Sequence, residues 1–478
     1  MTAQPVTSRS VTTPPATTPP VPSPRLDIRA LSRELPRRAR NAVAVTPGRL
    51  RLYSLSLTGL LALLGTALFA TTLIRLDALN TIRNQAGRSI VDAQRVHAAL
   101  SDADATAAAE FFAPVTVLTS NGTPADERAI HDRNLRTAAG YDTSIATAAE
   151  TIQELTRLNL DATAEKQLAV LARQLPVYTG LVERARDNNR AGNSSGEGYL
   201  RKGSQVMWQQ ILPAADRITA LNADRLDHAY QDATSGTDED LLILAFTVTA
   251  AGLAATQLML FRRTKRILNL PLVAASACVL IGVGWSATAF STQQARLADA
   301  RDASYTPMTL LAQSRVFALR ARVDESLSLI AFGNDAQPDA DFTTAINQLG
   351  FEKDGGQLPE GSLVQAIALD GPDVRARPGI RNDLQEWLAI HHAVTESLAT
   401  PDKLKDAVTT SLGRGTETFD RLDRALDGAV TDSQNRFTRQ VSDAAEPLHP
   451  LPAVVVITTI VAIGLGLAGI QRRINEYR

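Results

Sequence analysis

Four apolar stretches without charged residues divide the chain, at 53–74, 241–261, 270–291 and 451–471. A helix rises about 1.5 Å per residue, so roughly 20 apolar residues cross a hydrocarbon core of about 30 Å. The pattern therefore predicts four membrane-spanning helices. We favour a membrane helix over a cleaved signal peptide for the first stretch, because it is longer than the roughly 7 to 15 apolar residues of a signal peptide.

The segment between the first two spans, 75–240, has the periodicity of helices rather than strands. Small or apolar residues recur at alternating spacings of four and three, which places them on one helical face. Four such stripes run from Leu79 to Ala107, Leu135 to Ile152, Leu168 to Ala185 and Ile211 to Leu221. Loop signals rich in Gly and Asn separate them. We expect an antiparallel four-helix bundle whose two ends return to the membrane.

The segment between the last two spans, 292–449, repeats this plan with a less regular middle. Helical stripes open it at Ala312 to Ile330 and close it at Phe419 to Ser433, with loop signals at 351–361 and 370–379 between them. The predicted fold class is therefore all-α, with four transmembrane helices that carry two helical bundles.

The two halves are similar at an offset of 220 residues, where 94–112 aligns with 314–332. Five positions coincide in this alignment: Arg95 with Arg315, Val96 with Val316, Ala98 with Ala318, Asp104 with Asp324 and Phe112 with Phe332. The same offset overlays the first and third spans. We interpret this as an internal duplication of span, bundle and span.

Charge alternates with the spans, although the formal net charge is only -1. Residues 1–52 hold nine Arg against two acidic residues, whereas 76–240 holds 23 acidic against 16 basic residues and 292–449 holds 24 against 16. The link 262–269 and the tail 472–478 are also basic. Basic residues in short loops mark the cytoplasmic side, so we expect both termini inside the cell and both bundles outside it.

The amino-terminal region has two parts. Residues 1–24 contain seven Pro and six Thr, so we expect this arm to be disordered. Residues 25–52 form a basic juxtamembrane segment, which either lies on the anionic inner leaflet or only fixes the topology. The predicted basic cytoplasmic surface consists of Arg37, Arg38, Arg40, Arg262, Arg263, Lys265 and Arg266.

Proline positions suggest which span is mechanically coupled to its bundle. Between Pro47 and Pro114 there is no proline, so the first span and the first bundle helix are expected to form one rod. Pro307 follows the third span, and three prolines surround the start of the fourth. We therefore expect the first span to be the best link and the others to be broken.

Enzymatic chemistry is not indicated. The sequence has no phosphate-binding Gly-rich loop, no nucleophile elbow and no Cys/His cluster, and its one cysteine, Cys278, cannot form an intrachain disulfide. The i, i+4 pair His392 and Glu396 is interpreted as a solvated surface pair rather than a metal site. We expect a protein that is not an enzyme, with no cofactor, no metal and no nucleic acid.

Six residues are candidate contacts for a ligand or partner: Arg95, Asp104, Arg315, Asp324, Trp208 and Trp387. The first four recur in both halves, but solvated bundle faces would explain them too. The two tryptophans are either partner anchors or core residues, and core packing is favoured.

The architecture of a basic arm, two span-bundle-span modules joined by RRTKR and a short tail resembles the GlnX-type four-span membrane proteins of actinobacteria. This resemblance implies transfer of the state of an amino-acid-binding lipoprotein to a cytosolic serine/threonine kinase of the protein-kinase-G type. The predicted bundles are also similar to the four-helix sensor bundles of chemoreceptors and sensor kinases, although no signalling domain follows any span.

We therefore predict a multi-pass cell-membrane signal transducer. Its expected partners are membrane lipid, an extracytoplasmic solute-binding protein loaded with an amino acid, a cytosolic kinase and, by analogy, a second copy of itself. Two alternatives remain: a non-signalling scaffold of the envelope or division apparatus, and a direct small-molecule receptor. The receptor would have a pocket lined by the paired Arg and Asp residues.

Overall fold

The structure is a computed structural model, and it describes residues 46–83, 87–111, 124–157, 161–193, 195–234, 236–264, 269–330, 337–369 and 379–475. Over these residues the fold is helical, and the one strand-type backbone pairing is an isolated bridge between Phe351 and Gln357. The all-α prediction is confirmed.

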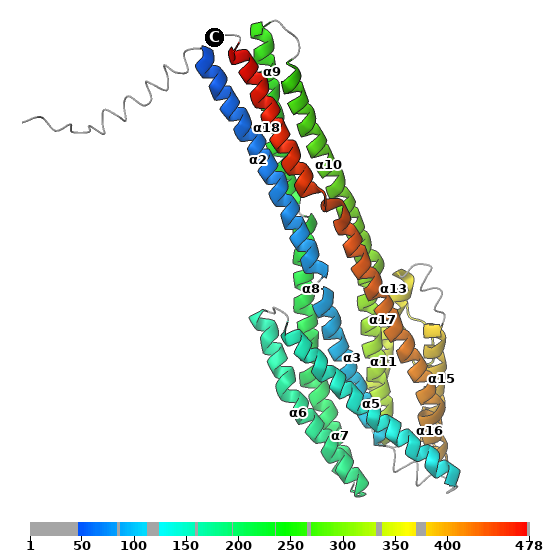
Figure 1. Cartoon of the computed structure of the whole chain (residues 1–478). Helices are drawn as coiled ribbons and strands as arrows, with labels where there is room; N and C mark the ends of the chain where they lie inside the picture. Colours follow the sequence, from blue (N-terminus) through cyan, green and yellow to red (C-terminus); the bar gives the residue numbers. More distant parts are fainter. Residues whose placement is uncertain are drawn as a thin grey trace, which may run out of the picture.

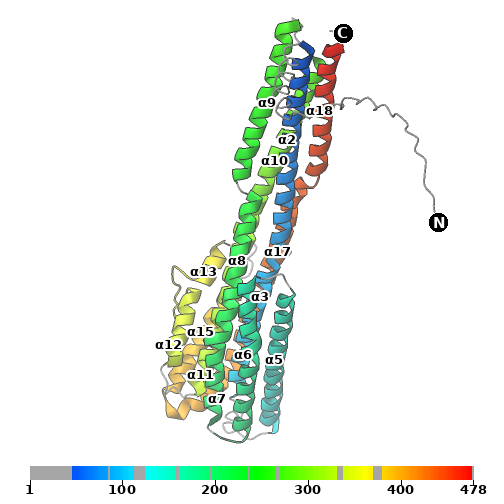
Figure 2. The ribbon, with the colours of Figure 1, turned by 90° about the vertical axis from the view of Figure 1, so that its left-hand side faces the viewer.

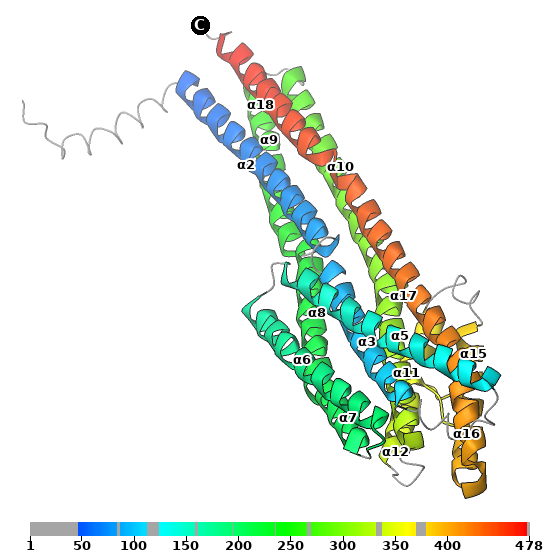
Figure 3. The same cartoon turned by 60° about the horizontal axis from the view of Figure 1, so that its bottom comes forward.

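Four helices are long and apolar enough to cross a membrane, which confirms the predicted spans. They are α2 (Thr46–Thr81), α9 (Gly236–Thr264), α10 (Leu270–Ala300) and α18 (Leu451–Asn475), and we call them the membrane bundle. They lie side by side, and α2 begins and α18 ends at the end farthest from the other helices (Figures 1 and 3). Leu55 and Leu270 are 71% and 76% exposed, so large apolar side chains face outward, as contact with lipid requires.

Small residues bring the helices of the membrane bundle close together. A Cβ atom added at Gly65 of α2 would collide with the Thr459 side chain of α18, and one added at Gly252 of α9 would lie 2.8 Å from Leu60 Cδ1. Close backbone approach is the usual basis of helix association in lipid, where apolar burial gives no driving force.

The first module, residues 87–234, contains four helical rods below the membrane bundle. These are α3 (Gly87–Glu110), α5 (Pro124–Thr156), α6 (Ala162–Arg190) and a continuous rod of α7 (Ser195–Val206), η2 (Met207–Ile211) and α8 (Leu212–Thr234). The predicted stripe of α3 is its buried face, with Val96, Leu100 and Ala103 all at 0% exposure.

The predicted stripe of α5 is wrong. Leu135 is 57% exposed, whereas the residues that this helix buries are Tyr141, Ser144, Ala148, Thr151 and Leu155. The Ala- and Thr-rich sequence offers two similar faces, and the large Tyr141 ring lies on the one that packs inward.

The second module, residues 306–445, begins with α11 (Thr306–Ile330), α12 (Gln337–Leu349), α13 (Ser362–Leu369) and α15 (Gly379–Leu398). Short helices η4 (Pro401–Lys403), α16 (Leu404–Thr410) and η5 (Ser411–Gly415) then lead into α17 (Thr416–Ala445), which η6 (Glu446–Leu448) joins to α18. Its core contains Phe342, Trp387 and Phe419, whose rings contact one another.

The two modules pack against each other along α3 and α11, the two helices that carry the 220-residue offset match. One apolar cluster combines Leu100 and Leu171 of the first module with Leu329 and Val394 of the second. The duplication itself stays a prediction, but its two halves meet face to face.

The expected break beyond the third span is wrong, whereas the α-helix is interrupted before the fourth span, as expected. Residues 270–330 form one run of 61 helical residues (Figure 2). Within 405–472, α17 ends at Ala445, and η6 with a turn at 449–450 separates it from α18. Helix α2 ends at Thr81 and α3 begins at Gly87, and 84–86 lie outside the described residues. Among the described residues, α10–α11 is therefore an unbroken link between the membrane bundle and the modules, and α17 joins α18 through η6.

A π-turn explains why Pro307 does not break its helix. In η3 (Arg301–Tyr305) the N–H of Thr306 donates to the carbonyl of Arg301, five residues earlier, and Pro307 follows directly. The N–H of Leu212 donates to Met207 in the same way, just before Pro213. A wider turn moves the preceding carbonyls away from the proline ring, which in a regular helix would clash with the carbonyl at i−4.

Candidate functional site

A cavity of about 650 Å³ lies between the two modules, and its walls come from α3, α8, α11, α17 and the π-turns. Three of the predicted contact residues line it: Arg95, Arg315 and Trp208. The other charged or titratable lining residues are His97, Asp216, Arg320, Tyr305 and Asp427. These three residues come from both halves of the sequence, and the fold brings them to one site.

The paired arginines Arg95 and Arg315 play different parts in the cavity wall. The guanidinium of Arg315 donates from Nε to Asp423 Oδ1 at 2.7 Å and from Nη2 to Asp423 Oδ2 at 3.0 Å, and its Nη1 pairs with Asp427. Arg95 is 52% exposed on its side chain and lies 3.4 Å from Asp92. Arg315 therefore braces α11 against α17, whereas Arg95 is held by one long contact.

Asp104 and Trp208 form a direct hydrogen bond, which joins two of the predicted contact residues. Asp104 is fully buried and accepts from Trp208 Nε1 at 3.0 Å, Ser204 Oγ at 2.9 Å and Tyr178 Oη at 3.2 Å. Burial raises the pKa of Asp104 to about 6, although the three donors act in the opposite direction. This network fixes the face of Trp208 that lines the cavity.

Asp324, the counterpart of Asp104 in the second half, has far fewer partners. Its nearest described cation is Arg320, whose Nε lies 4.0 Å from Asp324 Oδ2, and this oxygen has no hydrogen bond within the described part of the chain. Burial raises the pKa of Asp324 to about 8. Arg320 also lies over the Trp208 ring, 5.0 Å from its centroid.

Trp387 lies away from the cavity, in the core of the second module. It has 0% exposure and packs on Phe342 and Phe419. The core interpretation of this residue agrees with its position, whereas Trp208 is half-buried at the module boundary.

A buried charged network in the second module was not predicted from the sequence. Arg322 pairs with Glu325 and donates to Thr416 Oγ1 at 2.7 Å, while His391 Nδ1 lies 3.3 Å from Glu325 Oε1. Burial alone would raise the pKa of Glu325, but the Arg322 guanidinium lowers it. The 322–325 spacing in the sequence was the available signal.

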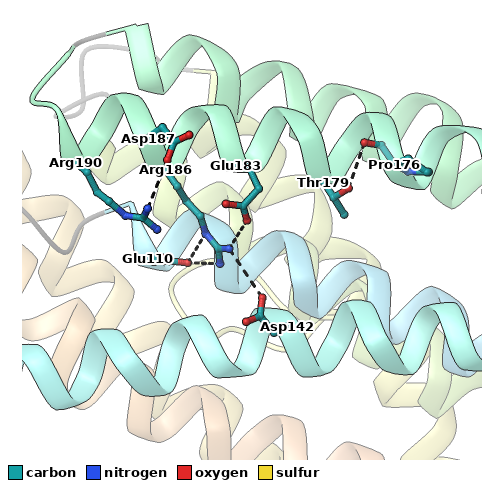
Figure 4. Close-up of polar contacts among 8 residues, drawn as sticks. All are labelled: Glu110, Asp142, Pro176, Thr179, Glu183, Arg186, Asp187 and Arg190. Atoms are coloured by element: carbon teal, nitrogen blue, oxygen red, sulfur yellow. Dashed lines mark hydrogen bonds and ion pairs between the residues drawn. The ribbon is translucent and has the colours of Figure 1, made fainter.

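Arg186 ties together three helices of the first module (Figure 4). Its Nε donates to Glu110 of α3 at 2.9 Å, its Nη1 donates to Glu183 of its own helix at 2.6 Å, and Asp142 of α5 lies 3.9 Å away. The guanidinium also lies over the Tyr141 ring at 4.3 Å. This cluster stabilises the module and is not part of the wall of the cavity between the modules.

The predicted basic surface is only partly described. Arg37, Arg38 and Arg40 lie outside the described residues, as do Lys265 and Arg266. The backbone of Arg262 and Arg263 forms the end of α9, where Arg262 is exposed. The carboxyl end of α9 lies at the end of the membrane bundle away from the modules (Figure 1).

Comparison with known proteins gives one match. Residues 78–231 match the model of a family described as the actinobacterial sensor domain, and this range covers the first module with the end of α2. Comparisons with curated proteins and with solved structures gave no match. The match supports an actinobacterial sensor protein, and the four candidate spans indicate a membrane protein.

Proposed function

We propose that this protein is a non-enzymatic membrane sensor, whose two modules lie outside the cell and relay an external signal through α10–α11 and α17–α18. The observation that carries the proposal is the continuity of α10, η3 and α11, which form one helical run from the membrane bundle to the boundary between the modules. A signal shifts such a switch only when it binds one conformation better than the other.

The proposed partners follow from the resemblance described above. On the outside we propose a solute-binding lipoprotein loaded with an amino acid, and on the inside a serine/threonine kinase that contacts the basic arm and the 262–269 link. Lipid contacts the membrane bundle, and a homodimer is compatible with the exposed faces of the modules. No nucleic acid or cofactor is part of the proposal.

Orientation is tested by labelling a single cysteine in intact cells. In a Cys278→Ser background, Ala191→Cys places a thiol in the exposed turn after α6. A membrane-impermeant maleimide should label it without lysis, whereas a thiol at Arg262 should require lysis. Protection of the Ala191 position from outside would overturn the proposed topology.

The relay is tested by helix-breaking substitutions in two spans. Ala298→Pro with Asp299→Gly interrupts α10 at exposed positions, and Asn80→Pro with Thr81→Gly is the matched change at the end of α2. With spin labels on α9 and α17 of the full chain in nanodiscs, the amino-acid-loaded solute-binding protein should change their distance in the wild type. We expect the α10 change to abolish this response and the α2 change to reduce it by less than half.

The scaffold alternative makes the opposite prediction. A spacer would bind the solute-binding protein equally with and without amino acid, or not at all, and neither helix-breaking change would alter any distance response. An equal loss of response in both variants would also contradict α10–α11 as the principal link.

A further inference from the structure

The cavity between the modules has the position of a regulatory site. The α3 and α8 helices of the first module form one side of it, and α11 and α17 of the second form the other. Any movement of one module against the other changes its shape. Apolar groups, including Leu212, Val316 and Phe317, make up much of the lining. A mostly apolar pocket with a few convergent polar groups is typical of a small-molecule site.

Most charges in the cavity wall are already paired. Asp427 pairs with Arg315, which Asp423 also holds through two hydrogen bonds. Asp216 Oδ1 lies 3.1 Å from His97 Nε2. Both carboxylates that line the cavity therefore have a nearby cationic or donor partner in the wall itself.

Arg320 is the lining cation with the weakest compensation. It makes no hydrogen bond among the described residues, and its nearest carboxyl, Asp324, is 4.0 Å away and largely protonated at neutral pH because burial raises its pKa to about 8. Stacking on Trp208 holds the guanidinium in place by its face and leaves the N–H edges available. Arg95 adds a second, half-exposed guanidinium in the same lining.

We propose that the cavity binds a small organic carboxylate, whose acid group pairs with Arg320 and Arg95 and whose carbon skeleton contacts Trp208. A planar guanidinium matches a carboxylate with two parallel N–H···O bonds, which are among the stronger hydrogen bonds in proteins. The fixed Trp208 ring gives the ligand a rigid apolar platform, since Asp104 holds its Nε1.

Such a ligand would link the two modules directly. Trp208 belongs to η2 in the first module, whereas Arg320 belongs to α11, the continuation of the third span. Occupancy would therefore favour the arrangement in which these elements are closest. The physiological role of this carboxylate site rests on the proposed sensor function. Binding of a carboxylate to the cavity can nevertheless be measured independently of that function.

The test is calorimetric titration of the full chain in nanodiscs with matched ligands. The probes are benzoate, succinate, acetate and L-glutamate, with benzamide and succinamide as uncharged analogues. We expect at least one carboxylate to bind with Kd of roughly 1 mM or tighter while its amide does not. Loss of one charge-assisted hydrogen-bonding partner should weaken binding by roughly tenfold or more in Arg320→Gln.

Two control variants separate a site from a structural effect. Arg320→Lys keeps the charge but loses the planar fork, so it should recover part of the affinity, and Arg173→Gln on the exposed face of α6 should bind like the wild type. Thermal unfolding checks that Arg320→Gln is folded. Bound carboxylate should also quench the tryptophan fluorescence of the wild type, and this quenching should disappear in Trp208→Phe.

Absence of binding by all four carboxylates, equal binding of the amides, or unchanged affinity in both Arg320 variants would overturn this inference. The sensor proposal fails separately. If no carboxylate binds but the loaded solute-binding protein still changes the distance between α9 and α17, the sensor stands and this site does not. If a carboxylate binds and no stimulus changes that distance, the site stands and the relay does not.

Discussion

Asp104 and Asp324 align at the 220-residue offset between the two halves of the sequence, and their surroundings differ sharply. Asp104 accepts three hydrogen bonds from side chains of the first module, whereas Asp324 has one distant cation and an oxygen without a hydrogen bond in the described structure. Both are buried, so burial raises both pKa values, but the donors hold the pKa of Asp104 near 6 while that of Asp324 reaches about 8.

This difference gives the two carboxyls different roles: Asp104 holds its module together, whereas Asp324 changes the electrostatics around Arg320. In the first module the carboxylate organises Tyr178, Ser204 and Trp208 around a single acceptor. In the second, the protonated Asp324 leaves the neighbouring Arg320 without full compensation. One ancestral helix position, if the halves are duplicates, would thus serve packing in one copy and electrostatics in the other.

Removing each carboxyl in turn tests most directly whether Asp104 and Asp324 have different roles. Asp104→Ala leaves three donors without an acceptor. The two buried ones, Tyr178 and Ser204, each cost about 1 to 3 kcal/mol, and the relief of a buried charge offsets part of this. We expect a net loss of roughly 4 kcal/mol in the free energy of unfolding. Urea titration followed by tryptophan fluorescence, in detergent at pH 6, measures it.

Asp324→Ala is the matched control for that experiment. Because Asp324 has no hydrogen bond to lose at Oδ2, its removal should change the free energy of unfolding by less than about 1 kcal/mol or increase it. Equal losses in the two variants would show that the two carboxyls have equivalent roles.

The pH dependence of stability should also differ between Asp104 and Asp324. A raised carboxyl pKa means that the folded state binds that proton more tightly than the unfolded state does. The contribution of this carboxyl to stability is therefore complete below about pH 4 and is lost as pH rises through the folded pKa. Asp104 contributes this loss up to about pH 6, and Asp324 contributes it up to about pH 8.

Between pH 6 and 7.5 the loss due to Asp324 should be roughly 2 kcal/mol. Asp324→Asn should remove most of this slope, and Asp104→Asn should leave most of it. The measurement is the free energy of unfolding at several pH values in the same detergent. A slope that only Asp104→Asn removes would reverse the assignment of the two carboxyls.

The smallest expected difference in stability is between variants of the aligned arginines, Arg315 and Arg95. Arg315→Gln leaves the half-buried Asp423 without its bidentate partner, so it should cost roughly 1.5 kcal/mol. Arg95→Gln removes one long, exposed contact and should change stability by less than about 0.5 kcal/mol. Thermal melts at low and high salt measure both losses of stability. An equal loss in the two variants would contradict the view that Arg315 joins α11 to α17 while Arg95 contributes little to stability.

The sequence predicted the features that local chemistry decides. The spans follow from apolar length, and the buried face of α3 follows from its regular stripe of Val96, Leu100 and Ala103. The face of α5 was assigned incorrectly, because Ala and Thr are nearly equivalent on both faces and only tertiary packing of Tyr141 selects one.

The site was predicted in part. The repeated Arg and Asp positions and Trp208 indicated a contact region, but the Trp208–Asp104 hydrogen bond joins residues 104 positions apart. Arg320 carried no sequence signal of its own, because its importance comes from the packing of α11 against the first module. Pro307 was interpreted as a break, since the pattern of residues does not reveal a π-turn.

The π-turn before Pro307 also changes the angular phase of everything that follows it. One additional residue in a turn rotates the subsequent side chains by about 100°, since a helix has 3.6 residues per turn. Thus α10 contacts α18 and α17, while α11, on the same rod, keeps α17 as a neighbour and also contacts α3, α12 and α13. Removing a single residue from 301–305 would restore the regular helical pitch, bring the Pro307 ring against the carbonyl four residues earlier and aim Arg315 and Arg320 at the wrong neighbours.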